Sequence, residues 1–186
     1  MDEQKLVATI ADIPEMMALL SILQEMELPN HYLAGGAITQ AVWNCQLGHA
    51  PLDQIKDFDV VYFDRAADNA ELHYEQQIHQ IRAFDRPVDV KNQAKVHQWY
   101  GKKFGSDIAP LTETEDGIRM WLPCFAVGVR LQNDSMRVFA PFGLDDLANM
   151  IIRPNKTAMS EDNYNAMNRR YQTRWPSLVI EPWSPV

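Results

Sequence analysis

The length of 186 residues and the mass of 21.4 kDa allow one domain with a hydrophobic core, and a composition of 46% hydrophobic and 23% charged residues excludes a disordered or low-complexity chain. The formal net charge of -8, with basic residues that form no stripe, argues against a long nucleic acid as partner. No apolar run approaches the roughly 20 residues that span a bilayer, and no signal-peptide pattern is present, so we expect a cytoplasmic protein without membrane contact.

The N-terminal third predicts a helix, a short strand and a second helix. Residues 14–27 carry apolar side chains at helical spacing, with Pro14 suited to the first turn. The stretch "HYLAGG" reads as a strand that runs into Gly35 and Gly36. A helical period follows, which Gly48 can end. Strand, glycine turn and helix therefore follow one another directly.

The middle of the chain predicts two strands joined by a helix. "DFDVVYFD" (57–64) has apolar residues on both faces, which is typical of a strand in a covered sheet. Residues 66–81 place Ala70, Tyr74, Ile78 and Ile81 on one helical stripe. "RPVDVKNQ" (86–93) is then the second strand.

The C-terminal part predicts a hairpin between helices. Thr112 and Glu115 have capping-box spacing before a short helix at "DGIRMW". "CFAVGVRL", the turn "QNDS" and "MRVFA" predict the hairpin. Helices are expected at 143–151 and at 160–175, the second with Ser160 as N-cap. The order indicates an α+β fold with a mixed β-sheet flanked by helices, in a single domain over 1–186 whose core is about 30–155 and whose C-terminal helical segment is about 156–186.

Two cysteines, Cys45 and Cys124, lie far apart without a CxxC or a histidine-rich spacing. This pattern argues against a zinc site and gives no reason for a disulfide. We expect both to be small core residues.

Two aspartates open the strand at 57–64. Since side chains alternate along a strand, Asp57 and Asp59 share one face with Cα atoms ~6.6 Å apart. Carboxylates that close repel each other, and a hard cation such as Mg²⁺ removes this cost. The pair predicts half of a metal site. The alternative is a solvated strand start beside Lys56.

Two further features strengthen the metal hypothesis. Gly35 and Gly36 open a helix, whose N-terminal N–H groups bind anions and whose missing Cβ atoms admit a phosphate. Asp89, on the predicted neighbouring strand, supplies a third carboxylate that can take a proton from an attacking hydroxyl. The alternatives are an ordinary turn and a surface strand residue.

These elements, in this order, resemble the DNA polymerase beta-like nucleotidyltransferase superfamily. More closely, the blocks "GGAITQAVWN", "DFDVVYFD", "VKNQAKVHQWY", "AVGVRL", "APFGLDDL", "IIRPN" and "RWPSL" are similar to a bacterial nucleotidyltransferase family formerly grouped as a domain of unknown function. The resemblance runs from about Tyr32 to Trp183. It implies a nucleotidyltransferase-like mixed sheet and transfer of a nucleoside monophosphate from an NTP substrate to a hydroxyl of unknown identity.

The resemblance also implies residue roles. Asp57 and Asp59 match the metal-binding pair, Gly35 and Gly36 match the phosphate-binding turn, and Asp89 falls where the third catalytic and metal-binding carboxylate is expected, with two Mg²⁺ ions as cofactors. One departure matters. Where the family often has Arg-Asn after the glycines, this chain has Thr39 and Gln40, which can donate hydrogen bonds to phosphate but carry no charge.

The block "VKNQAKVHQWY" offers further candidates. Lys91 and Lys95 can contact a triphosphate, and Asn92 can orient a base or ribose. An ion pair between Lys91 and Asp89 is the competing interpretation. For His97 we expect a hydrogen-bonded structural residue rather than a proton carrier.

The later blocks favour structural roles. Arg153 and Asn155 follow a helix, and we expect Arg153 to cap its carbonyls rather than to close over a substrate. Tyr164, Tyr171 and Trp175 have core spacing and do not indicate a base-stacking platform.

Two other functions remain open at this point. A haloacid-dehalogenase-like phosphatase also uses D-x-D, but on an early strand of a doubly wound sheet. A catalytically weak or inactive nucleotide- or partner-binding module on the same fold would fit the Thr39 and Gln40 departure. The sequence favours a Mg²⁺-dependent nucleotidyltransferase acting on a small-molecule or protein acceptor, and it does not indicate the oligomeric state.

Overall fold

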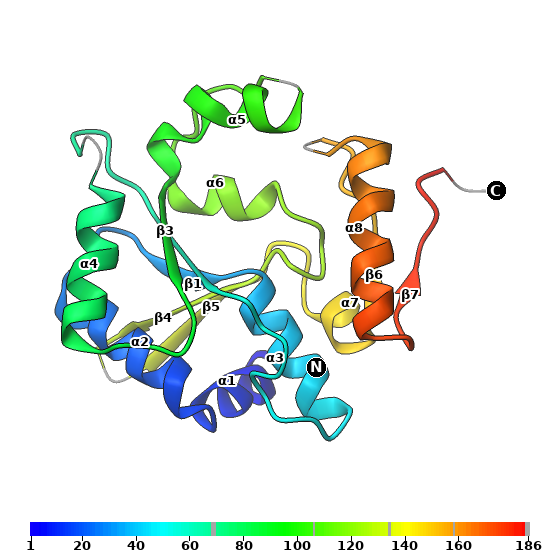
Figure 1. The fold of residues 1–186 in the computed structure, drawn as a ribbon, viewed down its shortest axis with the longest axis horizontal. Helices are drawn as coiled ribbons and strands as arrows, with labels where there is room; N and C mark the ends of the chain where they lie inside the picture. Colours follow the sequence, from blue (N-terminus) through cyan, green and yellow to red (C-terminus); the bar gives the residue numbers. More distant parts are fainter. Residues whose placement is uncertain (68–69, 106, 134, 158, 185–186) are drawn as a thin grey trace.

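A five-stranded mixed sheet lies at the centre of the computed structural model, which describes residues 1–67, 70–105, 107–133, 135–157 and 159–184 (Figure 1). The strand order is β3-β2-β1-β4-β5, with β2 and β3 parallel and the other neighbours antiparallel. The strand bounds are β1 (Tyr32–Ala34), β2 (Phe58–Tyr62), β3 (Val88–Asn92), β4 (Gly128–Gln132) and β5 (Ser135–Phe139).

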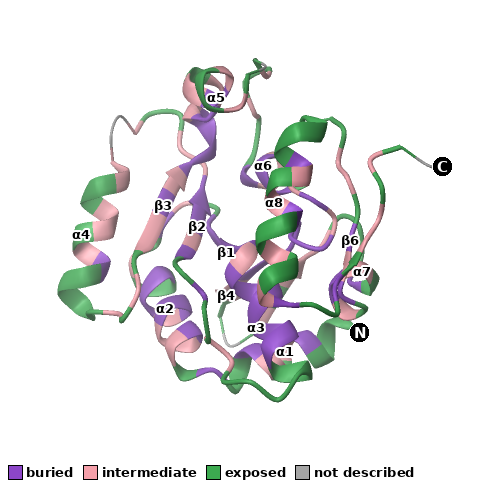
Figure 2. Cartoon of the chain, turned by 45° about the vertical axis from the view of Figure 1, so that its right-hand side comes forward, coloured by how far each residue is buried: buried purple, intermediate pink, exposed green. Residues whose placement is uncertain are grey.

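The main core lies between the sheet and the four N-terminal helices. These are α1 (Glu3–Ala11), α2 (Pro14–Glu25), α3 (Gly36–Gln46) and α4 (Glu71–Ile81). Alternate strand residues such as Leu33, Val60 and Val129 face this core. Leu6 and Ile10 of α1 are also fully buried in it, so α1, which the sequence did not predict, belongs to the core. Figure 2 shows the buried residues concentrated on the central strands and the inner helix faces.

The opposite face of the sheet carries a smaller apolar cluster. Tyr32, Ala34 and Val61 point to this side, where Ile118 of α6 (Thr114–Arg119) covers them. After β3 the chain forms the 3₁₀ helix η1 (Gln93–Lys95) and then α5 (His97–Phe104). Figure 1 places α5 and α6 together on one side of the sheet. Strand side chains that point to this face therefore lie on the side of α5 and α6 and not in the main core.

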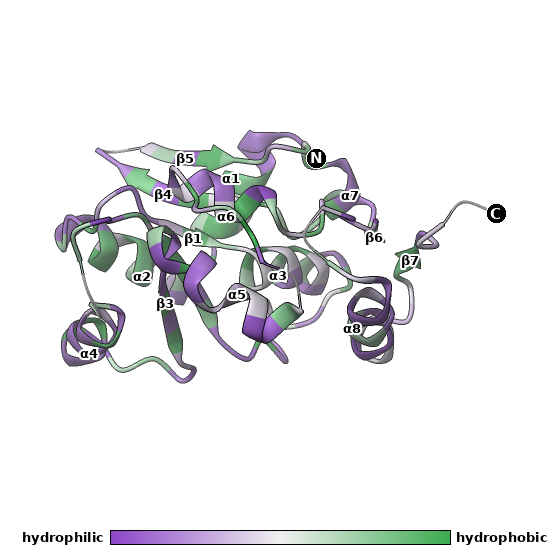
Figure 3. Cartoon of the chain, turned by 90° about the horizontal axis from the view of Figure 1, so that it is seen from above, coloured by the Kyte–Doolittle hydropathy of each residue, from purple (hydrophilic) through white to green (hydrophobic). Residues whose placement is uncertain are grey.

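The C-terminal part packs against α3. It contains α7 (Asp145–Ala148), β6 (Ile151–Ile152), α8 (Glu161–Arg174) and β7 (Val179–Ile180), with β6 and β7 in a parallel two-stranded sheet. The rings of Tyr171 and Trp175 lie 6.4 and 5.5 Å from that of Trp43 on α3. In Figure 3, α4 and α8 are largely hydrophilic and lie on opposite sides of the molecule. Helix α8 therefore buries a narrow aromatic stripe and exposes the rest of its surface.

The strands and helices predicted from the sequence are confirmed in type except at Ile151, which begins β6 although a helix was expected over 143–151. Three further expectations are corrected. The capping box is shifted by one residue: α6 has Glu113 as N-cap and Asp116 as its partner, and Thr112 instead donates its hydroxyl hydrogen to Asp116. Cys45 is exposed, whereas Cys124 is buried as expected. Ile81 is 56% exposed because α4 ends there, so the apolar stripe stops at Ile78. Part of the predicted 66–81 helix, residues 68–69, and Asp134 of the hairpin turn lie outside the described residues.

Within the described ranges no single helix is long and apolar enough to cross a membrane. Taken together, α1 and α2 are long and apolar enough by length and composition alone, but the two helices meet at a bend of 98°.

Candidate active site

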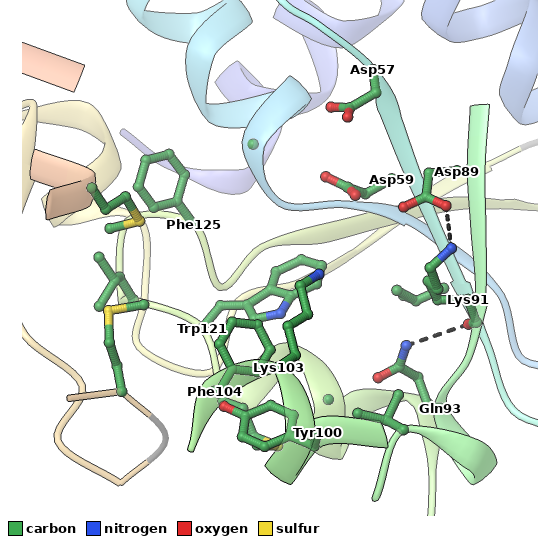
Figure 4. Close-up of a pocket in the computed structure, with 18 of the residues that line it drawn as sticks. Asp57, Asp59, Asp89, Lys91, Gln93, Tyr100, Lys103, Phe104, Trp121 and Phe125 are labelled. Atoms are coloured by element: carbon green, nitrogen blue, oxygen red, sulfur yellow. Dashed lines mark hydrogen bonds and ion pairs between the residues drawn. The ribbon is translucent and has the colours of Figure 1, made fainter. Parts of the chain in front are cut away.

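Three carboxylates converge on one pocket because of strand periodicity and register. Asp57 precedes β2, and Asp59 lies two residues later on the same face as Val61. In the parallel pair of β2 and β3, Asp59 is opposite Asp89 and Val61 is opposite Lys91. All three aspartates and Lys91 line a pocket of about 350 Å³ on the α5 and α6 side (Figure 4). The structure thus brings together the carboxylates that the sequence singled out.

Burial and neighbouring charges both act on the Asp59 carboxylate. Burial, followed by the charges of Asp57 and Asp89, raises its pKa from 3.8 to about 7, while Lys91 and Lys103 act in the opposite direction. A bound cation would stabilise the charged form of this carboxylate, because the cation offsets both the lost hydration and the repulsion from the neighbouring carboxylates.

Two lysines supply positive charge to the pocket. Lys91 forms an ion pair with Asp89, so the competing interpretation of Lys91 is the one observed. Both side chains remain about 40% exposed, at 41% and 40%, and such a pair exchanges partners at little cost. Lys103, on α5, was not predicted. Its ammonium lies 5.4 Å from the Trp99 ring centre, at the pocket wall.

The donor set fits a divalent cation at the Asp57 and Asp59 pair. Figure 4 shows both carboxylates on the pocket side of β2, while Asp89 is turned to Lys91. In the described parts of the chain, no group of three histidine, cysteine, aspartate or glutamate side chains is close enough to hold a metal. Mg²⁺ typically takes one or two protein carboxylates plus phosphate oxygens, so the pair suffices without the third.

The side chains of Trp121 and Gln40 cover the glycine turn. Gly35 is the N-cap of α3 with φ 71° and ψ -132°, and a Cβ there would lie 2.5 Å from Cζ3 of Trp121. A Cβ on Gly36 would lie 2.8 Å from Nε2 of Gln40. Gly36 and Gln40 line the pocket, and Gly35 lies behind the indole of Trp121. A phosphate that approaches Gly36 therefore meets the Gln40 amide first.

Other predicted nucleotide contacts are placed elsewhere. Thr39 is 0% exposed and donates its hydroxyl hydrogen to the carbonyl of Cys124 at 2.7 Å. The carbonyl oxygen of the Asn92 side chain accepts from the N–H groups of Ala94 and Asp64, both at 3.1 Å. Neither Thr39 nor Asn92 is among the described residues that line the pocket. Their contact with a nucleotide stays a prediction, and it would require these bonds to break.

The uncharged Gln40 has a charged neighbour. Its side-chain oxygen accepts from Nη2 of Arg174 at 2.9 Å, so a guanidinium from α8 lies beside Gln40, the residue that follows Thr39. Burial lowers the pKa of Arg174, yet the group stays protonated at neutral pH. Arg174 is not among the described residues that line the pocket, so its observed effect is to orient the Gln40 amide.

An aromatic wall faces the carboxylates and was missed by sequence reasoning. Tyr171, which was expected only in the core, lines the pocket and lies 4.9 Å from the ring of Phe125. No short motif joins the wall residues, since they come from four separate segments. They are Trp99, Tyr100 and Phe104, then Met120 and Trp121, then Phe125, and finally Met159, Met167 and Tyr171.

A family model described as nucleotidyltransferase matches residues 21–180. The chain belongs to this nucleotidyltransferase family. A solved NMR structure described as revealing a CCA-adding enzyme head domain is similar in fold, with a TM-score of 0.79 and 26% sequence identity over 97% of this chain and 96% of that chain. No curated protein matches.

The family and fold predicted from the sequence are therefore confirmed. Both support a general role in nucleotidyl transfer with an NTP as substrate. They also remove the basis for a haloacid-dehalogenase-like phosphatase, which requires a doubly wound sheet.

Two residues outside the pocket differ from expectation. Arg153 pairs with Asp146 at 2.8 Å and Glu181 at 3.3 Å and does not cap helix carbonyls. His97 does not line the carboxylate pocket, and its buried Nδ1 has no hydrogen-bond partner among the described residues, in contrast to the bonded histidine expected.

Proposed function

We propose that the protein is a Mg²⁺-dependent nucleotidyltransferase that moves a nucleoside monophosphate from an NTP to a hydroxyl acceptor and releases pyrophosphate. The observation that carries this proposal is the convergence of Asp57, Asp59 and Asp89 in one pocket, beside the glycine turn that begins α3. Family membership supports the same reaction class.

The carboxylates have separate roles in this proposal. Asp57 and Asp59 would hold the metal, with two divalent ions as the expected number, and bound Mg²⁺ would neutralise phosphate charge. Asp89 is released when Lys91 turns to the triphosphate. Asp89 then joins the metal ligands or takes the proton of the acceptor hydroxyl.

Bond changes follow from these positions. The acceptor oxygen attacks the α-phosphorus, the bond from that phosphorus to the bridging oxygen breaks, and pyrophosphate leaves with the electron pair. The proton passes from the acceptor hydroxyl to Asp89. Lys91, Lys103 and the N–H groups that begin α3 offset the charge of the leaving pyrophosphate.

The acceptor is proposed to be a small molecule or a protein hydroxyl. With a net charge of -8, the surface repels the backbone of a long nucleic acid. The alternative function is a binding module without turnover. It draws support from the uncharged Thr39 and Gln40 and from the Trp121 ring against Gly35.

Calorimetric titration with each of the four NTPs tests the proposal. Binding in the presence of Mg²⁺ is expected for at least one NTP, with loss of binding in EDTA and a large decrease in Asp59→Asn. The matched control is Asp85→Asn, an exposed aspartate away from the pocket, which should bind as the wild type does.

Three results are informative. Binding that needs both metal and Asp59, with pyrophosphate released when acceptors are added, supports an enzyme. Metal-dependent binding without pyrophosphate release across a panel of hydroxyl compounds supports the binding module. Binding that is indifferent to EDTA and to Asp59 contradicts the metal site.

A further inference from the structure

Trp121 occupies the junction between the two halves of the pocket. In Figure 4 its indole lies between the carboxylates of β2 and the rings of Tyr100 and Phe104. Its benzo ring packs against Gly35, where a Cβ would lie 2.5 Å from Cζ3 and 3.0 Å from Cε3. Because Gly35 has no side chain, the indole can lie directly on the turn that begins α3. One residue thus borders both the expected phosphate site and the aromatic wall.

Hydrogen bonds to the main chain fix the position of Trp121 in the absence of a ligand. The side-chain amide of Asn155 donates to the carbonyls of Trp121 at 2.9 Å and Arg119 at 3.0 Å, and the Trp121 N–H donates to Ile118 at 3.1 Å. Asn155 therefore connects the segment after β6 to the segment after α6. A platform fixed in this way loses little conformational freedom when a ring stacks on it.

The Trp121 indole differs from the two core indoles. Trp43 donates its ring N–H to the carbonyl of Leu147 at 2.8 Å, and Trp175 donates to Asn44 at 3.0 Å. Within the described residues, the indole N–H of Trp121 has no hydrogen-bond partner and its ring has no aromatic neighbour in contact, although the side chain lines the pocket. Trp121 is partly buried and packs against both apolar clusters, and its free indole donor and unpaired ring surface face the pocket. A ring with one packed side and one free side is suited to act as a ligand platform.

We propose that Trp121 is the stacking platform for the base of the NTP. This inference rests on the proposed function. If the triphosphate lies at the carboxylates, its covalently attached nucleoside must lie in the rest of the same pocket, and about 350 Å³ is within the range for small-ligand sites. Stacking is sequence-tolerant and grows with ring area. Purine NTPs therefore bind more tightly than pyrimidine NTPs.

Substitution at Trp121 separates stacking from phosphate binding. Trp121→Leu is expected to weaken ATP binding about 5- to 150-fold, the range for loss of one stacked base, while Trp121→Phe retains most of the affinity. Inorganic tripolyphosphate with Mg²⁺ should bind the wild type and Trp121→Leu equally. The control is Trp183→Leu, a partly exposed tryptophan outside the pocket, which should leave ATP affinity unchanged.

Fluorescence gives a second readout that does not depend on the leucine variant folding. ATP should quench tryptophan emission of the wild type more than tripolyphosphate does, and Trp121→Phe should lose the difference. Unchanged ATP affinity in folded Trp121→Leu, or an equal loss for ATP and tripolyphosphate, overturns the platform and leaves the proposed function intact. If the wild type binds neither ATP nor tripolyphosphate in Mg²⁺, both proposals fail.

Discussion

Asp59 combines burial with two neighbouring carboxylates, and the result is a predicted pH dependence of stability. Its pKa is about 7 in the folded protein against an ordinary value of 3.8. Between these values the folded chain holds a proton that the unfolded chain has released, so the free energy of unfolding decreases as pH rises through this window. We expect Asp59 to contribute a loss on the order of 2–4 kcal/mol between pH 4 and pH 8. Urea unfolding across this range measures it.

The Asp59→Asn variant isolates this contribution. It should be more stable than the wild type at pH 8 and should show a flatter pH profile, because the amide cannot ionise. Burial lowers the pKa of His31, which acts in the opposite direction at low pH, so the difference between variant and wild type is the quantity to compare. Parallel profiles for the two proteins would show that Asp59 is not the titrating group.

Individual site residues were predictable only where local periodicity determines them. The alternation of a strand was sufficient to place Asp57 and Asp59 on one face, and Asp89 followed from the next strand. Trp121 and Tyr171 were not predictable in this way, since they are 50 residues apart in the sequence and reach the pocket only through tertiary packing. For Lys91 the sequence allowed either an ion pair with Asp89 or a contact with the triphosphate, and it did not distinguish between the two.

At the scale of elements, the turn between β1 and α3 is expected to tolerate no side chain. Gly35→Ala should decrease the free energy of unfolding by more than about 2 kcal/mol, because φ is 71° and the new Cβ would overlap the Trp121 ring. Gly48→Ala is the control, since Gly48 has φ 74° but no neighbouring atom within 4 Å of a Cβ, and it should cost about 1–2 kcal/mol. Chemical denaturation measures both.

A double variant distinguishes the two causes at Gly35. In a Trp121→Ala background, the cost of Gly35→Ala should fall to near that of Gly48→Ala, because only the backbone conformation remains unfavourable. An unchanged cost would mean that the indole does not press on the turn.

Elements with a strong local pattern were predicted, and short or weakly patterned ones were not. Pro14 at the start of α2 and Ser160 before α8 are local signals that the structure confirms. Helix α5 has only eight residues, with Tyr100 and Phe104 as a one-turn apolar pair. Strands β6 and β7 have two residues each, so their pairing across the chain rather than a sequence pattern defines them. Helix α1 was missed although Asp2 caps it, because only Leu6 and Ile10 of its residues are buried.

At the scale of the whole molecule, α8 completes the core and walls the pocket at once. Its ring stripe packs on Trp43 of α3, while Tyr171 and Met167 reach the pocket. The same helix places Arg174 beside Gln40. The C-terminal helical segment 156–186 contributes Tyr164, Trp175 and Leu178 to the main apolar cluster, as the core spacing of Tyr164 and Trp175 predicts. The pocket and the core should therefore lose their structure together.

Trp175→Ala tests whether α8 unfolds with the rest of the chain. The substitution removes a buried ring that lies 5.5 Å from Trp43 and leaves the Asn44 oxygen without its donor, so we expect a loss of about 3–5 kcal/mol in the free energy of unfolding. Thr173→Ala, on the exposed side of the same helix, should change it by less than about 1 kcal/mol. Far-UV circular dichroism and tryptophan fluorescence should give coincident transitions for the wild type and both variants, because one cooperative core includes α8. Two separate transitions in Trp175→Ala, with the sheet retained after α8 has melted, would instead show α8 as an appended unit, and the aromatic wall could then open without unfolding the carboxylate strands.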